Sequence, residues 1–168
     1  PPVHQVLKDN PQTLQTGQSY ILDFPGFESN TRPVKVTLAW TDPAAAIDAN
    51  PTLVNNLNLR VTMGGSTVYY GNAFTNGFGV AGAAAGNTNI PVSWDTNADN
   101  FDDRNNVECV YIPTGALGAG TFRVEVIAQS VGVDAVAGGA IDQDFALVVS
   151  NLVEDPNLPD LTIYPGDL

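Results

Sequence analysis

The chain has 168 residues, of which 43% are hydrophobic, enough to form one domain with a sizeable core. Six Lys and Arg residues against 18 Asp and Glu residues give a net charge of −12. A surface this acidic excludes nucleic acid and anionic lipid as partners, because phosphate binding needs clustered Lys and Arg. No apolar run approaches the length of a membrane span.

Alternating hydrophobic residues predict strands, in chain order, at 19–24, 34–41, 57–64, 66–70, 107–112, 121–128 and 145–150. Turn signals such as Pro25-Gly26, Gly64-Gly65 and Gly138-Gly139 separate these segments. No segment keeps an apolar period of about 3.6 residues for three turns, so no helix is predicted.

Seven or eight short strands with Gly and Pro turns predict an all-β fold, a two-sheet antiparallel β-sandwich with long loops. Two connections, 42–52 and 71–106, are too long for hairpins and indicate the sheet-to-sheet crossings of a Greek key or jelly roll. We expect one such domain over residues 1–152. Residues 153–168 contain three Pro and four acidic residues, and we expect them to form a linker or a strap lying on the domain.

The sequence contains no recognisable set of catalytic residues. A Ser or Cys nucleophile needs an imidazole partner, and the only His is His4, close to the start of the chain. Cys109 is predicted, from the alternation around it, to be a small core residue. The adjacent carboxylates Asp102 and Asp103 point to opposite faces of an extended segment, which does not suit a glycosidase pair. We therefore expect that the chain by itself is not an enzyme.

Side-chain oxygens concentrate near the ends of the predicted strands, where they suit a hard cation such as calcium. Residues 95–100 place oxygens at alternate positions, but the bidentate Glu that would end an EF-hand loop is missing. The sequence instead predicts a calcium site built from sandwich loops. Its candidate ligands are Asp42, Asn55, Asn58, Asp95, Asn97, Asp99, Asp102, Asp103 and Glu108. The alternative is that these residues form solvated Asx-turns.

Aromatic residues around the long connection leave two further interpretations open. They are Tyr69, Tyr70, Phe74, Phe78, Trp94 and Phe101. They form either a stacking platform for carbohydrate or anchors that pin the loop to the sandwich. A hydrolase using Asp102 and Glu108 is a third possibility, and it predicts a cleft that holds one carboxyl group of raised pKa.

Six short motifs follow one another along the chain: 36–43 (VTLAWTDP), 53–59 (LVNNLNL), 69–72 (YYGN), 104–108 (RNNVE), 120–126 (GTFRVEV) and 143–149 (QDFALVV). Their order and spacing resemble the C-terminal β-jelly-roll domain of secreted subtilisin-like serine proteases, over roughly residues 17–151. In that family the second motif usually has Asp where this chain has Asn56 and Asn58. An amide oxygen still coordinates calcium, but the lost charge lowers the affinity. Residues 77–94 look like an insertion relative to the family.

The resemblance implies a non-catalytic domain that follows a protease domain in the same precursor, packs on it and stabilises it, often with bound calcium. The protease triad would lie upstream, so peptidase activity would belong to the parent protein. An extracellular location is implied as well, and the acidic, Asn-rich composition also favours it. We therefore expect an accessory domain excised from a larger precursor or expressed as a fragment of one. The alternative is a free-standing carbohydrate- or surface-binding β-sandwich module.

Overall fold

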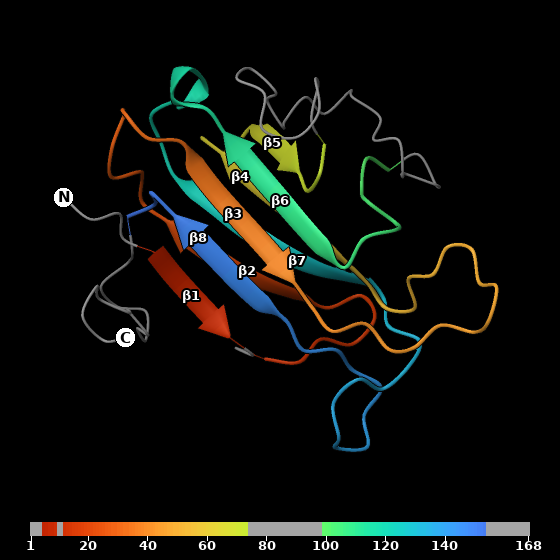
Figure 1. Ribbon diagram of the computed structural model, residues 1–168. Helices are drawn as coiled ribbons and strands as arrows, with labels where there is room; N and C mark the ends of the chain where they lie inside the picture. Colours follow the sequence, from red (N-terminus) through yellow and green to blue (C-terminus); the bar gives the residue numbers. More distant parts are fainter. Residues whose placement is uncertain (1–4, 10–11, 74–98, 154–168) are drawn as a thin grey trace, which may run out of the picture.

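The computed structural model describes residues 5–9, 12–73 and 99–153 (Figure 1). These residues form eight strands: β1 Gln5–Asp9, β2 Ser19–Phe24, β3 Val34–Ala39, β4 Asn56–Met63, β5 Thr67–Tyr70, β6 Val107–Ile112, β7 Phe122–Ser130 and β8 Ala146–Ser150. One 3-10 turn, Thr114–Ala116, follows β6, and no α-helix occurs in the described ranges. Within them, no helix has the length and apolar character needed to cross a bilayer. The predicted all-β fold is confirmed, and β1 is a strand that the predicted set did not contain.

The strands form two antiparallel sheets that lie face to face (Figure 1). Sheet 1 has the order β1-β8-β3-β6, and sheet 2 has the order β2-β7-β4-β5. The first strand thus pairs with the eighth, the second with the seventh, the third with the sixth and the fourth with the fifth. This pairing is the wrapping of a jelly roll, so the predicted two-sheet sandwich is confirmed together with its crossings.

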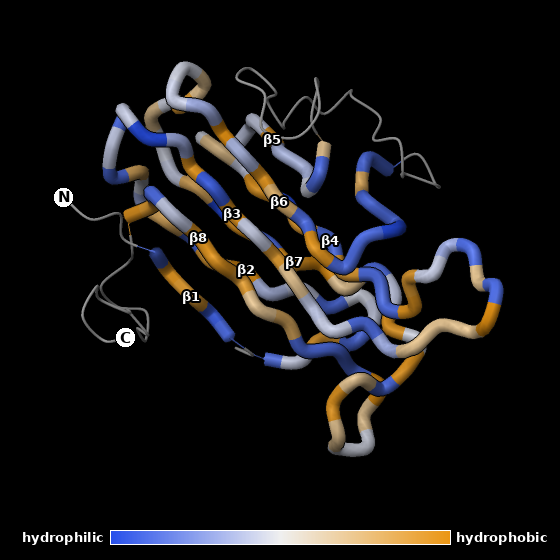
Figure 2. Tube along the Cα trace, viewed as in Figure 1, coloured by the Kyte–Doolittle hydropathy of each residue, from blue (hydrophilic) through white to orange (hydrophobic). Residues whose placement is uncertain are grey.

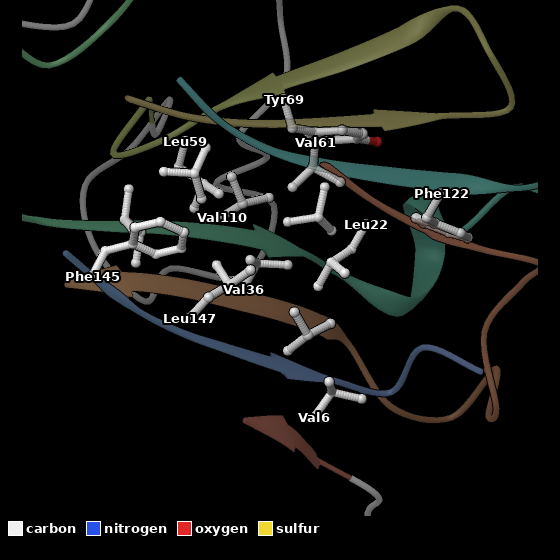
Figure 3. Close-up of a cluster of buried hydrophobic side chains, with 14 of the residues drawn as sticks. Val6, Leu22, Val36, Leu59, Val61, Tyr69, Val110, Phe122, Phe145 and Leu147 are labelled. Carbon is white, nitrogen blue, oxygen red and sulfur yellow. The ribbon is translucent and has the colours of Figure 1, made fainter. Parts of the chain in front are cut away.

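Hydrophobic side chains from the strands of both sheets fill the space between the layers (Figure 3). Val36 and Leu147 of sheet 1 face Leu59 and Val61 of sheet 2, and each is at most 1% exposed. Each such side chain, moved out of water, contributes about 1.5–3 kcal/mol to folding. The core therefore provides the rigid frame on which the loops are placed.

Cys109 corrects one prediction, because it lies half-buried on the outer face of sheet 1 beside Thr37 and not in the core. The inward residues of β6 are Glu108, Val110 and Ile112. Both alternate sets of residues in this strand are mainly apolar, so the pattern does not distinguish its two faces. Because Glu108 is charged, its set of residues was expected to face the solvent, and the set that contains Cys109 was wrongly expected to face the core.

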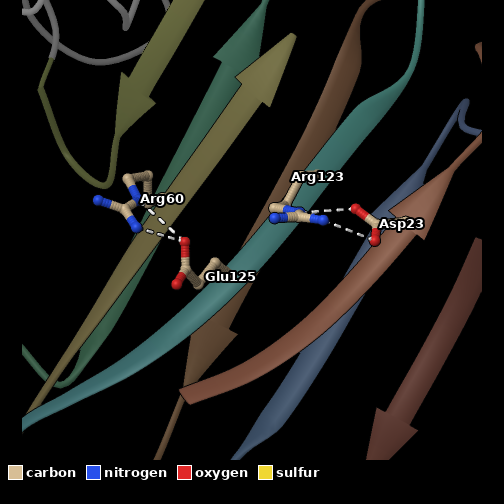
Figure 4. A network of polar contacts seen from close by, with 4 residues as sticks. All are labelled: Asp23, Arg60, Arg123 and Glu125. Carbon is tan, nitrogen blue, oxygen red and sulfur yellow. Dashed lines mark hydrogen bonds and ion pairs between the residues drawn. The ribbon is translucent and has the colours of Figure 1, made fainter. Parts of the chain in front are cut away.

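The outer face of sheet 2 is polar and carries two cross-strand ion pairs (Figure 4). Arg123 donates to both carboxylate oxygens of Asp23 at 2.8 and 3.0 Å, which lowers the pKa of that carboxyl. Arg60 donates to Glu125 Oε2 at 2.6 and 3.0 Å. These side chains line a surface hollow of about 430 Å³. Ion pairs at the surface contribute little to stability, and their presence indicates that this face is in contact with water.

Replacing Leu147 by Ala tests the core assignment, because Leu147 is fully buried in a central strand of sheet 1. We expect a loss of about 2–5 kcal/mol in the free energy of unfolding, measured by urea denaturation. The neighbouring Val148→Ala, on the outer face, is the matched control and should lose clearly less. Equal losses would show that the two faces of β8 are misassigned.

Candidate metal centre

The segment 99–106 lies beside the start of β4 and is mostly hydrophilic (Figure 2). Asp102 organises it: the Asp102 carboxylate accepts hydrogen bonds from the backbone nitrogens of Arg104 and Asn105 and from the side-chain amides of Asn105 and Asn72. Asn72, which has φ of 59°, also donates to Val107 O and accepts from Cys109 N. Asp102 and Asn72 thus tie the segment to the first residues of β6.

Two Asn residues of β4 connect this segment to sheet 2. Asn56 Nδ2 donates to Asp103 Oδ1 at 2.8 Å. Asn58 Nδ2 donates to Gln129 Oε1 on β7, and Gln129 Nε2 donates to Asp99 Oδ2 at 3.2 Å. Asn56 and Asn58 belong to the outward set of β4, yet they are only 9% and 1% exposed. Both side-chain amides therefore use their nitrogen as a donor to a protein acceptor. Asn56 donates directly to an acidic residue of the segment, and Asn58 donates to Gln129, which in turn donates to Asp99.

Glu108 reaches the same region from sheet 1, since it points inward from β6 and is fully buried. Its Oε2 accepts a hydrogen bond from Leu59 N on β4 at 2.7 Å. Gly71 makes room for this carboxylate: a side chain at Gly71 would overlap Glu108, whose Cβ would lie 2.9 Å from the new Cβ. A glycine directly after β5 is thus required by the position of one acidic side chain.

Three buried oxygens in this region have no hydrogen-bond partner: Asn56 Oδ1, Asn58 Oδ1 and Glu108 Oε1. An unsatisfied buried acceptor costs about 1–3 kcal/mol, and more where the group is charged. Amide and carboxylate oxygens are also the ligands that calcium prefers. The three oxygens therefore fit a hard cation better than they fit an empty protein interior.

Burial is the main cause that raises the pKa of Glu108 well above its usual value. The negative charges of Asp102, Asp103 and Asp99 raise it further, and only the Leu59 N–H opposes them. Glu108 Oε1 has no hydrogen-bond partner. A cation would give Glu108 Oε1 a partner, and it would balance the negative charge of the surrounding carboxylates.

The cluster unites five of the nine ligands predicted from the sequence: Asn58, Asp99, Asp102, Asp103 and Glu108. Asn56 was missed, although its position two residues before Asn58 on a strand places both on one face. Asp95 and Asn97 lie outside the described residues. Among those described, no group of three or more His, Cys, Asp or Glu side chains is placed to hold a metal ion, so the candidate site depends on its two amide oxygens.

Asp42 and Asn55 serve a different network. The Asp42 carboxylate accepts the backbone N–H groups of Val54 and Asn55 at 2.8 and 2.7 Å. Asn55 Oδ1 accepts from Gly132 and Val133, and Asn55 Nδ2 donates to Val133 O and to Gln143 Oε1. We call this network the amide clamp. It holds loops 42–55 and 131–144 together, which explains these polar residues without a ligand.

The other two interpretations gain little from the described residues. Tyr69 is buried in the core, and Tyr70 packs edge-on against Phe101 with ring centroids 5.0 Å apart, so both rings act as anchors. The remaining aromatic candidates, Phe74, Phe78 and Trp94, lie outside the described residues. The raised pKa predicted for a hydrolase occurs at Glu108, but that side chain is fully buried. Two surface hollows of the described part are lined by residues other than Asp102 and Glu108.

No protein-family model matched this chain, and no curated protein sequence matched it. The resemblance to subtilisin-like proteases therefore depends on the sequence motifs alone. His4, the only imidazole, lies outside the described residues.

The pH dependence of stability tests the electrostatics of Glu108. A folded-state pKa above the unfolded value of about 4.5 means that the folded state holds the proton more tightly. Stability due to this group is complete below that value and is lost as the pH rises through the folded-state pKa. In a chelator, we expect the free energy of unfolding to fall with rising pH above about 4.5, and to fall less in Glu108→Gln. The same slope in both proteins would contradict this assignment.

Gly71→Ala tests the packing around Glu108, because the new methyl group would overlap the carboxylate. We expect a loss of about 1–3 kcal/mol in the free energy of unfolding, measured in urea. The matched control is Gly26→Ala, whose added Cβ would meet no atom within 4 Å. This control should change stability by less than about 0.5 kcal/mol. Equal effects would show that Glu108 does not occupy the space beside Gly71.

Proposed function

We propose that this chain is a non-catalytic accessory domain of an extracellular subtilisin-like serine protease, and that calcium bound at the acidic cluster stabilises it. The single observation that carries the calcium part is the set of three buried, unpartnered oxygens on Asn56, Asn58 and Glu108. The protease part is supported by the six motifs and by the jelly-roll fold, which is the fold that the resemblance implies.

Calcium would bind oxygens from three separate parts of the sandwich. The two Asn side chains come from sheet 2, Glu108 comes from sheet 1, and the connecting segment contributes one nearby carboxylate, Asp103, which Asn56 already contacts. Calcium accepts six to eight oxygen ligands in flexible geometry, so a mixed amide and carboxylate set suits it. A cation held this way would fasten both sheets and the segment to one another at this end of the sandwich.

The accessory role follows from linkage between binding and folding. A ligand that binds only the folded state stabilises that state by RT ln(1 + [L]/Kd). A domain stabilised by extracellular calcium would remain folded beside its catalytic partner, the protease domain of the same precursor. Its function would be to brace and shield that partner.

Thermal melting with and without calcium tests the metal site directly. At a calcium concentration of 100 Kd the stabilisation is about 2.7 kcal/mol, or about 5–10 °C in Tm for a domain of this size. We expect Asn58→Ala and Glu108→Gln to reduce this shift, because each removes an unpartnered oxygen or its charge. Asp48→Asn, which removes an exposed carboxylate on a different loop, should preserve it. No shift in the unmodified chain would refute the calcium site.

Asn58→Asp provides a gain-of-affinity test, because calcium affinity increases with the charge of its ligands. We expect this variant to bind calcium more tightly in isothermal titration, with a larger Tm shift at the same calcium concentration. Weaker binding would contradict a ligand role for the Asn58 side-chain oxygen.

The accessory role is tested on the longer polypeptide from which the chain comes. We expect its upstream region to encode a subtilisin-like catalytic domain. Removing residues 5–153 should shorten the half-life of peptidase activity at raised temperature in calcium and leave the initial activity on a small peptide substrate nearly unchanged. An upstream region without a protease domain would refute the assignment and leave the calcium site unaffected.

A further inference from the structure

The outer face of sheet 1 differs from that of sheet 2, because it is apolar. One row of its register runs through Leu7, Val148, Thr37 and Cys109. The next row continues this character with two alanines and with Val107, which is 46% exposed. We call this surface the apolar sheet face; its central residues are Leu7, Thr37, Ala39, Cys109, Ala146 and Val148, all of them half-buried.

Charge is nearly absent from this face. The charged residues in its three rows are Asp9, on the edge strand β1, and Lys35, on the inner strand β3, and the Lys35 ammonium lies 5.7 Å from the centroid of the Tyr111 ring. An antiparallel sheet with one wet side normally alternates between apolar and polar residues, as sheet 2 does. Sheet 1 instead has apolar residues on both sides, which is typical of a sheet that is covered on both sides.

The size of the face limits what covers it. Four strands about 4.8 Å apart and three rows about 7 Å apart give an area of roughly 300 Å². A standard interface between separate proteins buries about 800 Å² on each partner. A second copy of the chain is also disfavoured, since each copy has a net charge of −12. An occupant on the same polypeptide needs less area, because the tether keeps its effective concentration high.

We propose that residues 154–168 of this chain cover the apolar sheet face. Their attachment point is close to it: Val153 N donates to Gly26 O at 3.0 Å, and Leu152 is buried just after β8, a central strand of sheet 1. Fifteen extended residues span up to about 50 Å, more than the width of the face. The segment has five large apolar residues, Leu158, Leu161, Ile163, Tyr164 and Leu168. Its three prolines reduce the conformational entropy that docking removes.

Cys109 provides a reporter, because it is the only Cys and lies on this face. The rate at which a small maleimide labels Cys109 is measured in the full chain, in a chain ending at Val153, and in the full-length double variant Leu161→Asp, Ile163→Asp. We expect labelling to be at least several-fold faster in both altered chains, because the cover is removed or weakened. Asp160→Asn, which retains the apolar residues, should label at the rate of the full chain.

A reporter on the opposite face controls for general loosening of the fold. Cys109→Ser combined with Thr62→Cys places the thiol on the outer face of sheet 2, where removal of residues 154–168 should leave the labelling rate unchanged. Circular-dichroism melts establish that each chain is folded at the labelling temperature. Equal Cys109 rates in the full, shortened and double-substituted chains would overturn the proposal. So would a Cys109 rate that depends on protein concentration and not on this segment, because a second copy would then be the cover.

Discussion

The structure at the candidate site depends on one local mismatch: β4 extends beyond its edge neighbour. β5 pairs only with residues 60–63 of β4, so the first half of β4 has no partner strand on that side. Gly71 N still reaches Leu59 O, but Leu59 N donates to the Glu108 carboxylate in place of a backbone carbonyl. A buried acidic side chain thus completes the edge of a sheet. The cost is a negative charge placed in the interior between the layers.

The surroundings of Glu108 add further negative charges, which raise its pKa and disfavour its ionised form. Asp102 is occupied by backbone and amide donors that shape the segment 99–106, and its charge still acts on Glu108. Asn56 and Asn58 turn their nitrogens to protein acceptors and leave their oxygens unpartnered. Next to them, Asn55 satisfies all of its groups in the amide clamp. Neighbouring residues at the start of β4 therefore enter a neutral network that is complete and an acidic network that leaves three oxygens without a hydrogen-bond partner.

Periodicity predicted most of the fold, because the inward residues of β3, β4 and β7 are strongly apolar and alternate mainly with polar ones. It failed where both faces of a strand are apolar, as at Cys109, and β1 was missed because five residues near the start of the chain carry too short a pattern. Five of the predicted ligands are brought together. The sequence could not show that Asp42 and Asn55 belong to a different network. A carboxylate that accepts hydrogen bonds from backbone N–H groups looks the same in a sequence as one that binds a metal.

The order of the strands also determines when the molecule can become stable. β8 lies between β1 and β3, and β7 lies between β2 and β4, so each sheet remains divided until late strands are inserted into it. The pairing of Gln5 with Ser150 joins positions near opposite ends of the described chain. Such long-range contacts make folding slow, and they form only when the last strand has left the ribosome. During synthesis, any domain that precedes this one would therefore have finished folding before the sandwich could close beside it.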